Sequence, residues 1–67
     1  MILYRVSVIA AMAKKNITIV ELSNLSTVSI STIGAARSGR GITKNSAKRI
    51  ASALDVPLEE LESKVSD

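Results

Sequence analysis

The sequence predicts a compact all-α domain of five short helices, and three observations support this class. Aromatic residues make up 1% of the chain although 46% of it is hydrophobic, so the core must consist of Ile, Val, Leu, Met and Ala, as in close-packed helices. Thr18, Ser29 and Thr43 occupy positions typical of helix N-caps. The length of 67 residues suits one small domain, which we assign to residues 1–67.

We expect the first helix over about residues 4–15. The stretch from Ala10 to Lys15 consists of good helix formers, and Asn16 is suited to end the helix. A β-strand is the alternative, because hydrophobic residues also alternate here, at Ile2, Tyr4, Val6 and Val8. We favour the helix, since a lone strand in this chain would have no partner.

The second helix is predicted to start at Thr18 and to run for about two turns. Thr18 and Glu21 have the spacing of a capping box, in which each side chain bonds the backbone N–H of the other. Ile17 and Leu22 have the spacing of a hydrophobic staple across the same cap. The short connection at residues 26–28 follows.

Ser29 is predicted to cap a third helix that extends to about Arg37. Ile33 and Ala36 fall on one face of this helix, so we expect them to point inward. So short a connection forces two helices to cross steeply, as in a helix-turn-helix. The sequence therefore predicts a helix-turn-helix over about residues 18–37, whose second helix is suited to enter the major groove of DNA.

Two more helices complete the prediction. Gly39 and Gly41 interrupt the chain, and Thr43 then caps a helix with an apolar face at Ala47, Ile50, Ala51 and Leu54. Asp55 ends that helix, and Pro57 suits the start of a last helix from Leu58 to about Lys64.

Charged residues are sorted along the chain. No acidic residue lies between positions 22 and 54, whereas five basic residues do: Arg37, Arg40, Lys44, Lys48 and Arg49. Acidic residues follow, at Asp55, Glu59, Glu60, Glu62 and Asp67. This order is typical either of a surface that binds a polyanion or of two solvated faces.

The absence of Cys and His narrows the classes of function. The chain has neither residue, so disulfides, thiol chemistry, most transition-metal sites and the usual general base are missing. We therefore expect no enzymatic activity, cofactor or metal. The apolar start of the chain is interrupted by Arg5 and is too short to span a bilayer, so we expect a cytoplasmic, nucleoid-associated protein without a membrane partner.

At this point the sequence resembles a known family. The run "ITIVELSNLSTVSISTIGAARSG" followed by "ITKNSAKRIASALDVPLEEL" is similar to the Cro/C1-type helix-turn-helix family, the lambda-repressor-like domains of phage repressors, plasmid regulators and antitoxins. The resemblance covers Val8 to Leu61. It implies a five-helix lambda-repressor-like fold and sequence-specific binding of double-stranded DNA, commonly as a homodimer on paired half-sites. It also implies a role in transcription.

Three departures from the family pattern lie in the second helix and the turn. Ile19 stands where members usually carry Gln, and Ser23 stands where they usually carry Ala. Thr27 stands at the usual turn glycine, which supplies a positive φ that strains a β-branched residue. Either the turn differs in this chain, or Thr27 stores strain.

The candidate DNA-binding residues combine this resemblance with the predicted helices. They are Thr18, Ser29, Ile30, Ser31, Thr32, Gly34, Ala35, Arg37, Arg40, Lys44 and Asn45. Ser31 and Thr32 can each make one hydrogen bond, while Ile30, Ala35 and the Thr32 methyl group suit thymine methyl groups. Gly34 would permit close approach. The basic residues and Asn45 suit phosphates, with a solvated basic rim as the alternative.

Two questions stay open from the sequence. The chain could instead be a protein-interaction module that binds another repressor or a toxin through Ile19, Ile30 and Ala35. For a homodimer, two apolar surfaces compete. One consists of Leu58, Leu61 and Val65, and the other of Ile2, Leu3, Tyr4 and Ile9.

Overall fold

Hydroxyl side chains begin three of the helices, as the sequence predicted. In the computed structural model, which describes residues 1–62, the side-chain oxygens of Thr18, Ser29 and Thr43 accept the backbone N–H three residues on, at 3.1, 3.2 and 3.1 Å. The Glu21 carboxylate completes the capping box, because it accepts the N–H of Thr18 at 2.9 Å. Each such cap contributes about 1 kcal/mol, so local chemistry fixes where these helices start.

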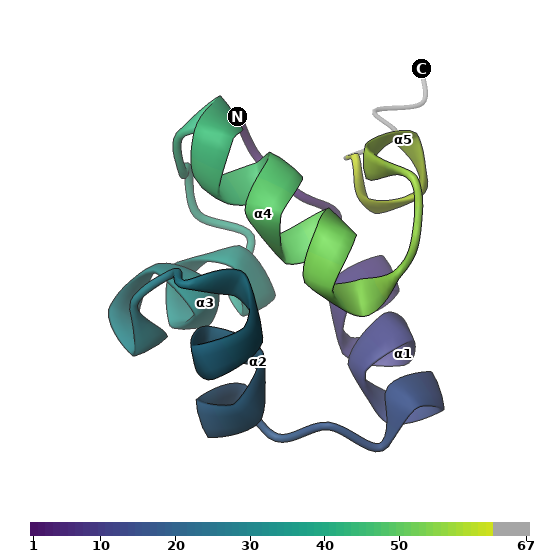
Figure 1. The fold of residues 1–67 in the computed structure, drawn as a ribbon. Coiled ribbons are helices and arrows are strands. Elements are labelled where there is room, and N and C mark those ends of the chain that lie inside the picture. The colour runs from purple at the N-terminus through teal and green to yellow at the C-terminus, as the bar shows by residue number, and fades with distance from the viewer. Residues whose placement is uncertain (63–67) are drawn as a thin grey trace.

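The described residues form five helices arranged around α4 (Figure 1). Their bounds are α1, Arg5–Lys15; α2, Ile19–Ser26; α3, Ile30–Arg37; α4, Lys44–Leu54; and α5, Leu58–Leu61. The helix α4 contacts each of the other four, with α2 and α3 on one side and α1 and α5 on the other. The predicted all-α class with five helices is confirmed.

The core is aliphatic. The buried hydrophobic residues are Leu3, Val8, Ala11, Met12, Leu22, Val28, Ile33, Ala36, Ala47, Ile50, Ala51, Leu54 and Leu61. They include the whole apolar face predicted for α4 and both inward residues predicted for α3. Tyr4 lies outside this core with 45% of its surface exposed, so the fold is closed without any aromatic side chain among the described residues.

The segment before α1 is extended and pairs with two distant parts of the chain. Ile2 forms an antiparallel bridge with Gly41, and Leu3 forms one with Glu62. Leu3 is only 1% exposed, so the bridge also places a core side chain. The helix predicted over residues 4–15 is confirmed with its start at Arg5. The premise that a strand here would lack a partner is wrong, because its partners are non-local.

The helix α5 ends at Leu61, so the predicted end near Lys64 is wrong. Glu62 is extended, with φ −66° and ψ 144°, and it pairs with Leu3. The Leu61 carbonyl accepts the N–H of Tyr4 at 2.7 Å, which ties the end of α5 to the segment before α1. Of the apolar surface proposed on this helix for a homodimer, Leu61 is buried in the core, and Val65 lies outside the described residues.

Thr27 ends α2 in the left-handed region, with φ 57° and ψ 26°. The turn therefore keeps the positive φ that glycine supplies in the family, and the strained alternative applies. Asn16 and Asp55 end α1 and α4 with φ 52° and 58°, but both residue types tolerate this region better than a β-branched residue does. The Thr27 hydroxyl accepts a hydrogen bond from the Arg49 guanidinium at 3.1 Å, which offsets part of the strain.

We expect Thr27→Gly to leave the free energy of unfolding unchanged or to raise it by up to about 1 kcal/mol, because it relieves the strain. Thermal unfolding followed by circular dichroism measures the effect. Ser38→Gly is the matched control: Ser38 follows α3 with φ −98°, so glycine there gains nothing and lowers the melting temperature. A drop for Thr27→Gly as large as for Ser38→Gly would contradict the assignment of strain.

Candidate nucleic-acid interface

Two serines of α2 fasten the connection to α3, which consists of residues 27–29. The Ser23 hydroxyl donates to the Val28 carbonyl at 2.6 Å. The Ser26 hydroxyl donates to the Leu22 carbonyl at 2.6 Å and accepts the Val28 N–H at 3.3 Å. These bonds fix the angle at which the chain enters α3.

Ser26 is a functional position that the sequence reasoning missed. It is buried, yet its hydroxyl is satisfied as both donor and acceptor. The signal was its place in the last turn of a helix, where a serine hydroxyl reaches the carbonyl four residues back and the first N–H groups beyond the helix.

The helix α3 turns one face to solvent. Ile33 and Ala36 are buried against the core, as the spacing predicted. The exposed residues of the helix are Ile30, Ser31 and Arg37, and the partly buried ones are Thr32, Gly34 and Ala35. Every candidate residue on α3 therefore lies at least partly on its accessible side.

The hydroxyls of three candidate residues already have partners within the chain. Thr18 and Ser29 accept the backbone N–H groups of Glu21 and Thr32 in their caps. The hydroxyls of Ser29 and Thr32 also lie 2.9 Å apart and are hydrogen-bonded to each other. A hydroxyl has one donor and two acceptor sites, so each keeps limited capacity for a further hydrogen bond.

A hollow lies between α3 and the start of α4. On the α3 side it is lined by Ser31, Thr32 and Ala35, three of the candidate residues. The other wall consists of residues 41–43 and Ser46. The sequence does not predict that these residues line the hollow, because they do so only when the connection between α3 and α4 folds back beside α3. The hollow is therefore rich in hydroxyl groups.

Three of the remaining candidates are next to lining residues of this hollow in the chain, and their charged or polar side chains are exposed. Arg40 lies in the connection after α3, and Lys44 and Asn45 lie in the first turn of α4. Arg37 is exposed at the end of α3. The candidates are thus brought to α3, to its connection with α4 and to the first turn of α4, whereas Thr18 lies apart, at the start of α2.

Two carboxylates of the acidic C-terminal part lie away from this surface, whereas Glu21 lies in the first turn of α2, where its carboxylate helps to cap the helix. Glu59 and Glu60 belong to α5, which contacts α1 and α4 but, among the described residues, neither α2 nor α3 (Figure 1). Arg37, Arg40 and Lys44 thus lie on or close to α3 in the chain, while the carboxylates of α5 belong to a helix that does not contact it, a distribution that suits a polyanion.

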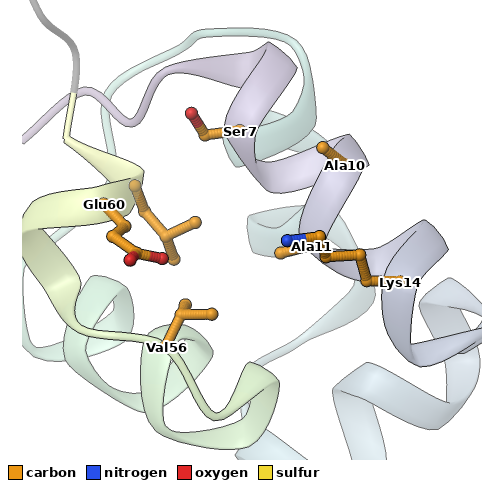
Figure 2. A pocket seen from close by; sticks show the side chains of 7 residues that line it. Ser7, Ala10, Ala11, Lys14, Val56 and Glu60 are labelled. Atoms are coloured by element: carbon orange, nitrogen blue, oxygen red, sulfur yellow. The ribbon is translucent and has the colours of Figure 1, made fainter.

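A second groove lies between α1 and α5 and shares no lining residue with the hollow beside α3. It is lined by Ser7, Ala10, Ala11, Lys14, Val56, Glu60 and Leu61. Figure 2 shows Lys14 and Glu60 reaching into this groove from opposite walls. Its polar groups are the Ser7 hydroxyl, the Lys14 ammonium and the Glu60 carboxylate, and its other lining side chains are aliphatic.

Residues 1–62 hold neither a cluster of metal ligands nor a membrane-spanning helix. No group of three or more His, Cys, Asp or Glu residues in that range is arranged to hold a metal ion. None of its helices combines the length and the apolar character that crossing a bilayer demands.

Comparison with known proteins identifies the family of the chain. A family model described as "Helix-turn-helix" matches residues 8–61, from α1 to the last residue of α5. No curated protein and no solved structure matches the chain. The matched family is non-catalytic, and membership implies DNA binding. Because the match spans most of the chain, including the capped α2 and α3 and the basic start of α4, the chain belongs to the Cro/C1-type helix-turn-helix family.

Proposed function

We propose that the protein binds double-stranded DNA sequence-specifically as a small transcriptional regulator of the phage, plasmid or mobile-element repressor type. The observation that carries the proposal is the surface of α3. Its accessible side chains are short, and exposed cations lie just beyond them at Arg37, Arg40 and Lys44. Such a surface suits a helix in the major groove with phosphates on its flank.

The cations and Asn45 would position the protein on the DNA backbone. Lys44 and Asn45 occupy the first turn of α4, whose open N–H groups add to the attraction for a phosphate. Thr18 and Ser29 start α2 and α3 and would offer their remaining hydrogen-bonding capacity to the backbone. Ser31, Thr32 and Ala35 would meet the base edges. In a cell, a protein bound in this way would lie on nucleoid DNA.

A homodimer on paired half-sites would follow from the exposed N-terminal surface. Ile2 and Tyr4 are 53% and 45% exposed, and Val6 and Ile9 continue this apolar area along α1. Each surface loses one member to the core, Leu3 from the N-terminal surface and Leu61 from the last helix. The N-terminal surface keeps three exposed members, Ile2, Tyr4 and Ile9, whereas Leu58 on the last helix is partly buried, so the N-terminal surface is the better supported of the two.

A protein-interaction module is the second candidate function. It is favoured by exposed hydrophobic residues on the helix-turn-helix, namely Val20, Leu25 and Ile30. Ile19, which the sequence analysis included in this surface, is partly buried and packs against the core. Another repressor or a toxin would be the partner, and DNA would then not be bound.

Selection from random duplexes at low salt tests the proposed function. We expect a short sequence motif to be enriched and to be bound with an affinity that falls steeply as salt rises. Fluorescence anisotropy on the enriched duplex measures that dependence, and a scrambled duplex of equal composition is the control for specificity. Failure to retain any duplex at low salt would contradict the proposal and favour the protein-interaction module.

A further inference from the structure

We infer that α3 recognises its DNA site chiefly through the C5 methyl groups that pyrimidines expose in the major groove. The inference rests on the proposed DNA binding and concerns what the helix reads once it is in the groove. Thymine carries this methyl group, and 5-methylcytosine carries the same group at the same place. The inference assigns specificity to apolar contacts, with hydrogen bonds to base edges in a minor role.

Before Arg37, the side chains of α3 lack the groups that read bases by paired hydrogen bonds. Guanine is read by Arg or Lys and adenine by Asn or Gln, through side chains long enough to reach two atoms of one base. The accessible residues before Arg37 are Ile30, Ser31, Thr32, Gly34 and Ala35, and none is of these types. The Thr32 hydroxyl is also engaged with Ser29 at 2.9 Å.

Apolar surface takes the place of those groups. Ile30 is 50% exposed in the first turn of α3, and Ala35 is partly buried at the edge of the hollow. A ligand that covers the Ile30 side chain would gain the free energy of removing that apolar surface from water. Methyl groups are the apolar feature that the major groove offers, so Ile30 and Ala35 are complementary to them.

Gly34 gives independent support. It lies in the middle of an eight-residue helix, where glycine weakens the helix relative to alanine. A Cβ atom at this position would have nothing within 4 Å, so packing within the described chain does not require glycine. The bare backbone between Ile30 and Ala35 brings the helix axis closer to whatever it faces, and short side chains need that approach in order to touch the bases.

Charge decides between DNA and a protein as the occupant of this surface. No acidic residue lies between positions 22 and 54. Arg37, Arg40 and Lys44 are exposed beside the apolar residues, so the surface combines methyl-sized contacts with a cationic rim. A duplex supplies both the methyl groups and the anionic flank.

The test uses the full chain and the duplex obtained by selection, prepared in three forms. One is unmodified, one carries deoxyuridine in place of every thymine, and one carries 5-methylcytosine in place of every cytosine. Deoxyuridine removes the methyl group and keeps every hydrogen-bonding atom. We expect it to weaken binding about three- to fivefold for each methyl group contacted, which corresponds to burial of one methyl group.

The two modified duplexes separate the sources of the methyl group. A loss of affinity with deoxyuridine assigns the contact to thymine, and a gain with 5-methylcytosine alone assigns it to methylated cytosine. Equal affinity for all three duplexes overturns the inference while the proposed DNA binding stands. If no duplex is bound at all, the proposed function itself has failed, so the two failures are distinct.

Variants of exposed residues locate the contact. Ile30→Ala should bring the affinity ratio between the thymine and deoxyuridine duplexes towards one. Leu25→Ala is the matched control, because Leu25 is 64% exposed on α2 and outside the proposed contact, and it should leave that ratio unchanged. An unchanged ratio for Ile30→Ala would remove Ile30 from the proposal.

Gly34→Ala gives a readout in which stability and binding move in opposite directions. The melting temperature should rise, because alanine favours the helix and its Cβ meets no atom within 4 Å. The affinity for the unmodified duplex should fall, since the added methyl group holds the helix away from the bases. A rise in melting temperature with full affinity would contradict the close approach.

Discussion

Ile50→Ala is expected to lower the free energy of unfolding by about 2–5 kcal/mol, because it leaves a cavity as well as removing apolar contacts. Ile50 is fully buried on α4, the helix that contacts all the others. A small single core rarely supplies more than about 3–5 kcal/mol, so much of the variant should be unfolded even without denaturant. Urea titration followed by far-UV circular dichroism measures the loss.

Lys48→Ala is the matched control for this prediction. Lys48 lies on the same helix and is exposed, so its truncation should change stability by less than about 0.5 kcal/mol. A loss below about 1 kcal/mol for Ile50→Ala would contradict the prediction. It would mean that the surrounding helices move to fill the cavity.

Replacing Arg37 and Lys44 together by alanine is expected to reduce DNA affinity and to flatten its dependence on salt. Each phosphate contact contributes about 0.9 to the slope of log affinity against log salt, so loss of two contacts should reduce that slope by about 2. Fluorescence anisotropy at several salt concentrations on the selected duplex measures the slope, and the unmodified protein gives the reference value.

The double variant Lys14→Ala and Lys15→Ala removes the same net charge from another place. Both lysines are exposed in the last turn of α1, outside the proposed interface. They should alter the slope far less than Arg37 and Lys44 do. Equal changes in the two double variants would show that overall charge, and not phosphate contact at α3 and α4, controls affinity.

The parts of the fold that the sequence predicted well depend on neighbouring residues. Thr18, Ser29 and Thr43 were recognisable as caps because each bonds an N–H group only three residues away. The inward face of α4 was likewise readable from spacing alone. These interactions are complete within one or two turns, so the order of residues already contains them.

The errors arose where distant segments meet. The end of α5 depends on Leu3, which pairs with Glu62 from the other end of the described chain. No periodicity near Lys64 carries that information. The pairing of Leu3 with Glu62 and the hydrogen bond from the Tyr4 N–H to the Leu61 carbonyl determine where the helix ends.

The candidate site shows the same division. The exposed and buried sides of α3 followed from the positions of Ile33 and Ala36. The hollow did not, because Ser46 comes to line the same hollow as Ser31 only through the path of the connection between α3 and α4. The roles of the eleven candidate residues in binding DNA stay predictions, because they depend on the sequence and shape of the DNA site as well as on the protein.

The bridge between Ile2 and Gly41 has a consequence for how the chain folds. Together with the bond from the Ile42 N–H to the Met1 carbonyl, it closes a loop that contains α1, α2 and α3. Closing so long a loop costs conformational entropy that local helix formation does not, so this contact should form late in folding. Arg40 immediately precedes Gly41. The segment that carries one of the proposed phosphate contacts would thus be among the last to become ordered, although its neighbours in sequence form early.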